Sequence, residues 1–170
     1  RGMRNAMNSW DKSDSYVDER YNTAHIGEND KALMKRLFNA GTDHRKYLRM
    51  ITVYADITAP LYWWKEYDTY KVGTVANSCS TMHKLTSKRL TLDDFSIDNN
   101  EQGYYVDILY DLNALIDNYK KTNDIKYFRM LVGLLPSSFN QKRTVMLNYE
   151  VLANIYKSRQ GHKLKEWHEF

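Results

Sequence analysis

Small polar side chains, one thiol and one imidazole are concentrated in the nine residues 76–84. The amide and hydroxyl groups of this segment belong to Asn77, Ser78 and Ser80. Such groups suit either a capped turn at a helix start or a loop that cradles a ligand. Cys79 as a nucleophile would need a base, and His83 could face it only if the segment is helical. We therefore favour a binding or capping role over thiol catalysis.

The histidines are too scattered to predict a metal site. They are His25, His44, His83, His162 and His168. The closest pair is six residues apart, which places the two rings on nearly opposite sides of a helix, whereas zinc sites use pairs about four apart. The sequence also lacks a P-loop and a three-glycine dinucleotide fingerprint. We expect no metal, and we expect any phosphate to be bound by discrete Arg and Lys side chains or a helix N-terminus.

The composition is that of a folded domain. The 170 residues are 42% hydrophobic and 14% aromatic, with two prolines and seven glycines, which excludes a disordered chain. The 25 basic and 21 acidic residues are interleaved and leave a net charge of +4, so nucleic-acid binding is not indicated. A single cysteine and the lack of a long apolar run predict a cytoplasmic protein without a membrane span. Both ends of the chain are expected to be trimmed.

Helical periodicity dominates the pattern. Residues 1–27 are predicted to be a loop-rich N-terminal segment, and residues 28–170 a single domain. A helix is expected from Asn29 to Gly41, a long one from Gly103, and a short one capped by Asn123 that ends before Pro136. A further long helix is predicted from Asn140 to Ser158, with Val145, Met146, Tyr149, Leu152, Ile155 and Tyr156 facing inward.

One strand and one unusually aromatic segment lie between the first two of these helices. Residues 50–58 are rich in β-branched residues and predict a strand that Pro60 ends. Residues 61–72 place five rings around a helical wheel, which indicates an interior helix or a stacking surface. The rings are those of Tyr62, Trp63, Trp64, Tyr67 and Tyr70.

Three segments in order resemble the flavin-dependent thymidylate synthases. The turn at residues 40–44, followed by the strand to Pro60, is similar to that family's glycine-histidine turn. Asn77 and Ser80 can be placed on the asparagine and second serine of the family signature. Leu135-Pro136, followed by Asn148, Leu152, Arg159 and the ending at residues 164–167, follows the family's C-terminal pattern.

The resemblance implies a helix-rich α+β fold with a small antiparallel or mixed sheet, assembled as a homotetramer with FAD and nucleotide sites between subunits. In the family, reduced flavin delivers hydride and methylenetetrahydrofolate supplies a one-carbon unit to deoxyuridine monophosphate. The residues carried over to the nucleotide are Arg159, Ser80, Asn77 and Ser78. Those carried over to FAD are Asn148, His44 and Lys71.

The sequence departs from the family at its charged positions. Residues 68–72 lack the signature's arginine-histidine-arginine, Met82 stands for its closing arginine, and Val132 and Glu150 stand for two further arginines. Replacements could come from Lys65, Lys71, His83 and Lys84. Because each lost bidentate contact weakens binding by about tenfold or more, we do not expect thymidylate synthesis at the family's usual rate. The alternative is a catalytically inactive homologue acting as an oligomeric scaffold or interaction protein.

Overall fold

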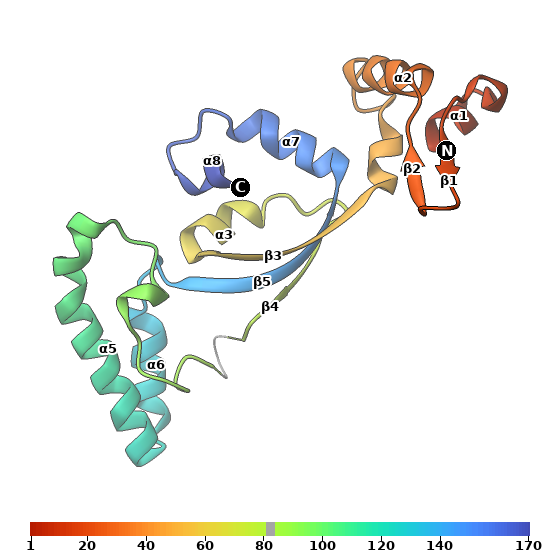
Figure 1. Ribbon diagram of the computed structural model, residues 1–170. Coiled ribbons are helices and arrows are strands. Elements are labelled where there is room, and N and C mark those ends of the chain that lie inside the picture. Colours follow the sequence, from red (N-terminus) through yellow and green to blue (C-terminus); the bar gives the residue numbers. More distant parts are fainter. Residues whose placement is uncertain (81–83) are drawn as a thin grey trace. The chain divides into compact units, whose positions relative to one another are not determined.

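A computed structural model describes residues 1–80 and 84–170 (Figure 1). The chain divides into two compact units. Unit 1 comprises Arg1–Val53, Val72–Thr74 and Met146–Ser158, and unit 2 comprises Tyr54–Lys71, Val75–Val145 and Arg159–Phe170. Helices and small sheets make up the molecule, which confirms the predicted helix-rich α+β class. Among the described residues, no helix is both long and apolar enough to cross a membrane.

Unit 1 holds most of the N-terminal elements. They are α1 (Gly2–Ala6), the 3-10 helix η1 (Trp10–Lys12), β1 (Tyr16–Asp18), β2 (Thr23–His25), α2 (Glu28–Asn39), η2 (Lys46–Met50) and nearly all of α7 (Tyr149–Arg159). β1 and β2 form an antiparallel hairpin in which Tyr16 pairs with His25. Residues 1–27, predicted to be rich in loops, thus contain short regular elements of three to five residues.

The helix α2 confirms the helix predicted from Asn29 to Gly41. Its N-terminus is capped from outside, since the carboxylate of Asp14 accepts the backbone N–H groups of Asn29 at 2.8 Å and Asp30 at 3.1 Å. Gly41, with φ of +104°, follows the helix in a left-handed conformation that favours glycine.

Unit 2 contains a three-stranded sheet and a helical hairpin. Its elements are β3 (Thr52–Pro60, whose first two residues belong to unit 1), α3 (Leu61–Tyr67), β4 (Val75–Ser78), η3 (Leu92–Asp94), η4 (Asn99–Glu101), α5 (Gln102–Thr122), α6 (Ile125–Leu134), β5 (Asn140–Asn148, whose last three residues belong to unit 1) and α8 (Glu166–Glu169). The strand order is β3-β5-β4, so β5 is the central strand.

The helices α5 and α6 pack side by side as a hairpin (Figure 1). Asn123 ends α5 in the left-handed conformation, with φ of 53°, and its N–H donates to the carbonyl of Tyr119 at 2.8 Å. Asp124 then caps α6 by accepting the N–H of Lys126 at 3.0 Å. The core beneath the hairpin is made of Leu85, Leu90, Phe95, Leu112, Leu115, Ile116 and Leu131.

The prediction of one long helix from Asn140 to Ser158 is wrong. Residues 140–148 form the strand β5, and α7 begins only at Tyr149. Val145 and Leu147 are buried in β5 on alternate residues, which is the period of a strand. A short apolar run flanked by polar residues fits either element, so tertiary pairing with β3 and β4 decides the outcome.

The inward face predicted for the second half of that helix is right at Ile155 and wrong at Tyr149 and Tyr156. In α7 the buried apolar residues are Val151 and Ile155, whereas Tyr149 is 45% exposed and Tyr156 is 71% exposed. Ile155 is one of the residues predicted to face inward, whereas Val151 lies one residue before the predicted Leu152, which is half-buried. Because α7 starts nine residues later than predicted, its packing is set by the end of β5 rather than by one continuous helical face.

Candidate functional site

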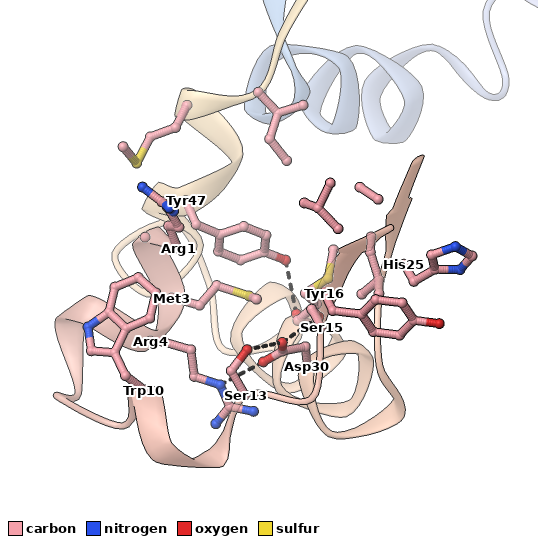
Figure 2. A pocket seen from close by; sticks show the side chains of 17 residues that line it. Arg1, Met3, Arg4, Trp10, Ser13, Ser15, Tyr16, His25, Asp30 and Tyr47 are labelled. Carbon is pink, nitrogen blue, oxygen red and sulfur yellow. Dashed lines mark hydrogen bonds and ion pairs between the residues drawn. The ribbon is translucent and has the colours of Figure 1, made fainter. Parts of the chain in front are cut away.

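A cavity of about 830 Å³ opens in unit 1, between α1, the β1–β2 hairpin, α2 and η2 (Figure 2). Aromatic rings and thioethers make up much of its lining, including those of Trp10, Tyr16, Tyr47, Met3 and Met34. The ring of Tyr16 stacks on that of His25, with centroids 4.8 Å apart and planes inclined by 17°. These rings are arranged to contact a flat apolar group.

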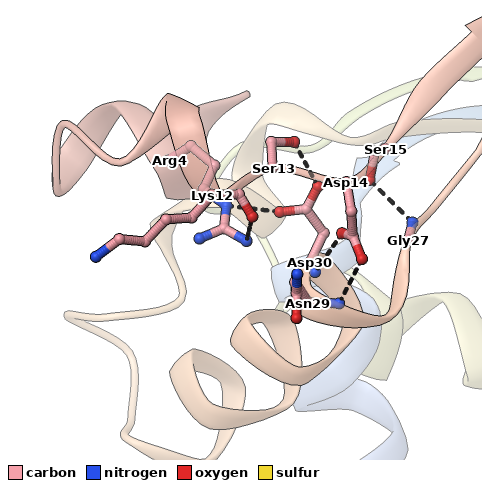
Figure 3. A network of polar contacts seen from close by, with 8 residues as sticks. All are labelled: Arg4, Lys12, Ser13, Asp14, Ser15, Gly27, Asn29 and Asp30. Atoms are coloured by element: carbon pink, nitrogen blue, oxygen red, sulfur yellow. Dashed lines mark hydrogen bonds and ion pairs between the residues drawn. The ribbon is translucent and has the colours of Figure 1, made fainter.

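A buried ion pair lies beside this cavity (Figure 3). Arg4 Nε donates to Asp30 Oδ1 at 2.6 Å, and both side chains are almost completely buried. The hydroxyls of Ser13 and Ser15 donate to Asp30 Oδ2 at 2.7 and 2.5 Å. The hydrogen bond from Ser15, assisted by those from Ser13 and Arg4, lowers the pKa of Asp30 to about 2 in spite of its burial. The carboxylate is therefore charged and fully partnered at neutral pH.

Two of the three predicted flavin contacts, Asn148 and His44, belong to unit 1, and the third, Lys71, belongs to unit 2. Asn148 caps α7, because its Oδ1 accepts the N–H of Val151 at 3.1 Å. Its amide nitrogen lies so close to Gly73 that a Cβ added there would approach within 2.9 Å. The side chain of His44 is exposed, and its backbone N–H donates to the carbonyl of Gly41 at 3.1 Å. Asn148 is buried, and the assignment of both residues to FAD stays a prediction.

Glu150, which stands where the family has an arginine, is buried and paired. Arg45 Nε lies 3.0 Å from its Oε2, and Arg45 Nη2 donates to Asn154 Oδ1 at 3.0 Å. The cation of Arg45 therefore balances the carboxylate locally. Sequence reasoning missed Arg45, because only the fold brings η2 next to α7.

Arg159, the predicted nucleotide contact, is held in a polar cluster of unit 2. Its Nη1 donates to Glu66 Oε2 at 2.9 Å and its Nε to the hydroxyl of Tyr70 at 2.9 Å. The guanidinium carbon also lies 4.7 Å from the ring centroid of Trp167. These contacts fix the plane of the guanidinium, a condition for directional recognition of a ligand.

Glu66 is the centre of this cluster. Its Oε2 also accepts the indole N–H of Trp167 at 3.0 Å and lies 3.1 Å from His162 Nε2. One carboxylate oxygen thus joins α3 to residues at the end of the chain. The sequence contained no signal for this role, since Glu66 reads as a solvated residue between rings.

Three of the five rings of the aromatic segment are interior, in agreement with the first of the two sequence interpretations, and those of Tyr62 and Tyr70 are half-buried. Trp63, Trp64 and Tyr67 are at most 2% exposed. The ring of Trp63 lies 4.6 Å from that of Trp167 and 5.5 Å from that of Phe170, between centroids. The helix is shorter than predicted and ends at Tyr67 rather than Val72.

The remaining residues predicted to contact a ligand are exposed. Asn77 and Ser78 are on β4, Ser80 follows two residues later, and Lys71 follows α3. None of the contacts of Arg159 given above involves them. Their assignment to the nucleotide or to FAD stays a prediction, and Met82 and His83 lie outside the described residues. Lys65 and Lys84 are exposed as well.

No protein-family model and no curated protein sequence matches the chain. Solved structures do match it. One is the flavin-dependent thymidylate synthase of Helicobacter pylori complexed with FAD and dUMP, with a TM-score of 0.72, 18% identity, and coverage of 98% of this chain and 81% of that one. A second structure of that enzyme with FAD and dUMP gives a TM-score of 0.74, 17% identity, and coverage of 99% and 81%.

The chain has the flavin-dependent thymidylate synthase fold. The resemblance found in the sequence is therefore confirmed at the level of the fold. At 17–18% identity, the similarity does not by itself extend to ligands or activity.

Proposed function

We propose that this chain binds FAD and a pyrimidine deoxynucleotide. The observation that carries the proposal is the fold, which matches over 98–99% of the chain the structures of an enzyme solved with both ligands. The match includes the candidate segments at both ends of the sequence pattern, from His44 to Arg159. We further propose a cytoplasmic homo-oligomer, a tetramer by resemblance, that folds as one thymidylate synthase-like domain after an N-terminal segment.

The arrangement around Arg159 supports recognition of the nucleotide base. An arginine has five N–H donors in a planar fork, and Glu66 and Tyr70 each accept one of them. The side chain is 19% exposed, so its guanidinium is both held in place and accessible. The carbonyl oxygens of a pyrimidine are suitable acceptors for such a group. A preorganised donor loses less entropy on binding than a free side chain does.

The charged residues of both units indicate that the chain binds phosphate weakly. Glu150 takes the position of a family arginine and is neutralised by Arg45, so this pair contributes no net positive charge. The lysines available in unit 2, including Lys71, are exposed point charges without the fork of arginine. We propose that the nucleotide is held mainly through its base, and that any thymidylate synthesis is much slower than in a family member with its arginines.

The second candidate is an inactive oligomeric scaffold, and exposed apolar side chains on α5 favour it. Tyr104 is 80% exposed, Tyr110 73% and Val106 58%. Such residues on one helix are typical of a surface that a protein partner covers. This candidate requires a stable oligomer or complex, but no response to either small ligand.

Thermal unfolding with added FAD or dUMP distinguishes the two candidates. A ligand at a hundred times its dissociation constant stabilises the folded state by about 2.7 kcal/mol, or roughly 5–10 °C for a chain of this size. We expect each ligand to raise the melting temperature of the purified chain, with FAD also detected by its yellow colour after gel filtration. If neither ligand at millimolar concentration shifts the transition, the binding proposal is wrong and the scaffold becomes the better account.

A further inference from the structure

The cavity in unit 1 lies in the part of the chain that contributes little to the sequence resemblance. The lining residues that the structure describes all fall within residues 1–51, whereas the resemblance begins near Gly41. A volume of about 830 Å³ is within the range of small-molecule sites. None of the residues predicted to contact FAD or the nucleotide lines it. The predicted FAD and nucleotide contacts are therefore not part of this cavity.

The lining is suited to flat apolar groups. Trp10 is 45% exposed and Tyr16 is 62% exposed, so both rings can be reached from solvent. In the view of Figure 2, the ring of Tyr47 and the thioether of Met3 lie between Trp10 on the left and Tyr16 on the right. Methionine side chains are flexible and polarisable, and they adapt to the edges and faces of aromatic ligands.

The buried charges beside the cavity are already satisfied. Arg4 donates one hydrogen bond from Nε to Asp30 and another from Nη2 to the carbonyl of Lys12 at 2.9 Å. The carboxylate of Asp30 accepts Ser13 and Ser15, and Ser15 also accepts the N–H of Gly27 at 3.1 Å. This network presents no uncompensated buried charge to a ligand (Figure 3). Arg1 contributes a charge at the exposed rim only.

We propose that this cavity is a ligand site for an uncharged aromatic small molecule, which stacks on the rings of Tyr16 and Trp10 and packs against the methionines. A phosphate-bearing ligand such as FAD or dUMP suits this lining less well, because Arg4 is already paired with Asp30 and Arg1 is an exposed side chain at the rim. The inference is thus independent of the proposed function.

The test uses N-phenyl-1-naphthylamine, an uncharged aromatic dye that fluoresces strongly in apolar surroundings. We expect saturable binding to the full chain with one dye per protein and a micromolar dissociation constant. Met3→Trp fills the cavity with a larger side chain, and we expect it to weaken binding at least tenfold. Met7→Trp is the matched control, since Met7 is 50% exposed and does not line the cavity.

A second variant covers the case in which Met3→Trp does not fold. Tyr16→Ala removes an exposed stacking ring, and we expect it to weaken dye binding several-fold while the melting temperature stays nearly unchanged. Saturating FAD or dUMP should leave dye binding unaltered. The proposal is overturned if the dye does not saturate, if Met3→Trp and Met7→Trp weaken it equally, or if FAD or dUMP displaces it. Binding of FAD and dUMP is measured separately by thermal unfolding, so the two proposals can fail independently.

Discussion

Arg159 and Glu66 form an ion pair, 2.9 Å from Nη1 to Oε2, that joins the end of α7 to α3. The same oxygen of Glu66 accepts the indole N–H of Trp167 at 3.0 Å. The carboxylate therefore has two roles: it orients the guanidinium proposed to contact the nucleotide, and it fastens α8 to the aromatic residues of α3. A single substitution at Glu66 therefore affects both contacts.

Replacing Glu66 should destabilise the protein. Glu66→Ala leaves the N–H groups of Arg159 and Trp167 without their acceptor, which we expect to cost about 1–3 kcal/mol. The melting temperature should fall by roughly 2–12 °C. Glu66→Gln keeps an acceptor oxygen and should lose less. Glu28→Ala removes a carboxylate that is 87% exposed and should change the melting temperature little. Equal losses in Glu66→Ala and Glu28→Ala would show that the cluster contributes nothing to stability.

The cluster illustrates what sequence patterns can and cannot reveal. The helices α2, α5 and α6 could be predicted because each repeats apolar residues at helical spacing and has local end signals, such as Gly41 and Asn123. Glu66 has no such signal, since its partners lie about 90 to 100 residues further along the chain. Pairing at that separation is a property of the fold.

The strand β5 shows the same limit for secondary structure. Between Gln141 and Leu147 the sequence supplies a single apolar stretch, too short to separate a period of two from a helical period. Its position between β3 and β4 makes it a strand. In the candidate site, Arg159 and Asn148 could be singled out by motif, whereas Arg45 could not, because its relation to Glu150 depends on tertiary contacts.

Because the buried carboxylate of Asp30 is charged in the folded protein, we predict that the free energy of unfolding depends on pH in the acid range. Its pKa is about 2 in the folded protein, below the ordinary 3.8, because Ser15, Ser13 and Arg4 stabilise the charged form. The contribution to stability is therefore complete above about pH 4 and is lost as the pH falls toward 2. Urea unfolding between pH 2 and 5 should show this loss.

The variant Asp30→Asn should be less stable than the wild type at pH 5, and the difference should shrink toward pH 2. Asp11→Asn, an exchange of the same kind at an exposed position in η1, is the control. If the difference between wild type and Asp30→Asn stays constant over this range, the ionised carboxylate is not the source of the stability.

Two glycines should respond to alanine in opposite directions. At Gly27 an added Cβ would lie 2.1 Å from Asp14 Cγ and 2.5 Å from the Asp14 carbonyl oxygen, so the cap of α2 would be displaced. We expect Gly27→Ala to cost about 1–3 kcal/mol. At Gly133, within α6, no atom of the described residues lies within 4 Å of an added Cβ, and alanine should stabilise the helix by about 0.5–1 kcal/mol. Denaturant midpoints measure both, and a stabilised Gly27→Ala would contradict the packing at this turn.

The nucleotide proposal makes its sharpest prediction at Arg159. Arg159→Lys keeps the positive charge near Glu66 but replaces the planar fork by a single ammonium, so the directional contact with a pyrimidine carbonyl is lost. We expect the dissociation constant for dUMP, measured by calorimetry, to rise about tenfold, corresponding to roughly 1.4 kcal/mol. Arg143→Lys is the matched exchange in the same unit, since Arg143 pairs with Asp68 at 2.8 Å and stacks over Trp64. Its dUMP affinity should match that of the wild type. If both variants bind dUMP as the wild type does, Arg159 does not contact the base, whatever the effect of either exchange on stability.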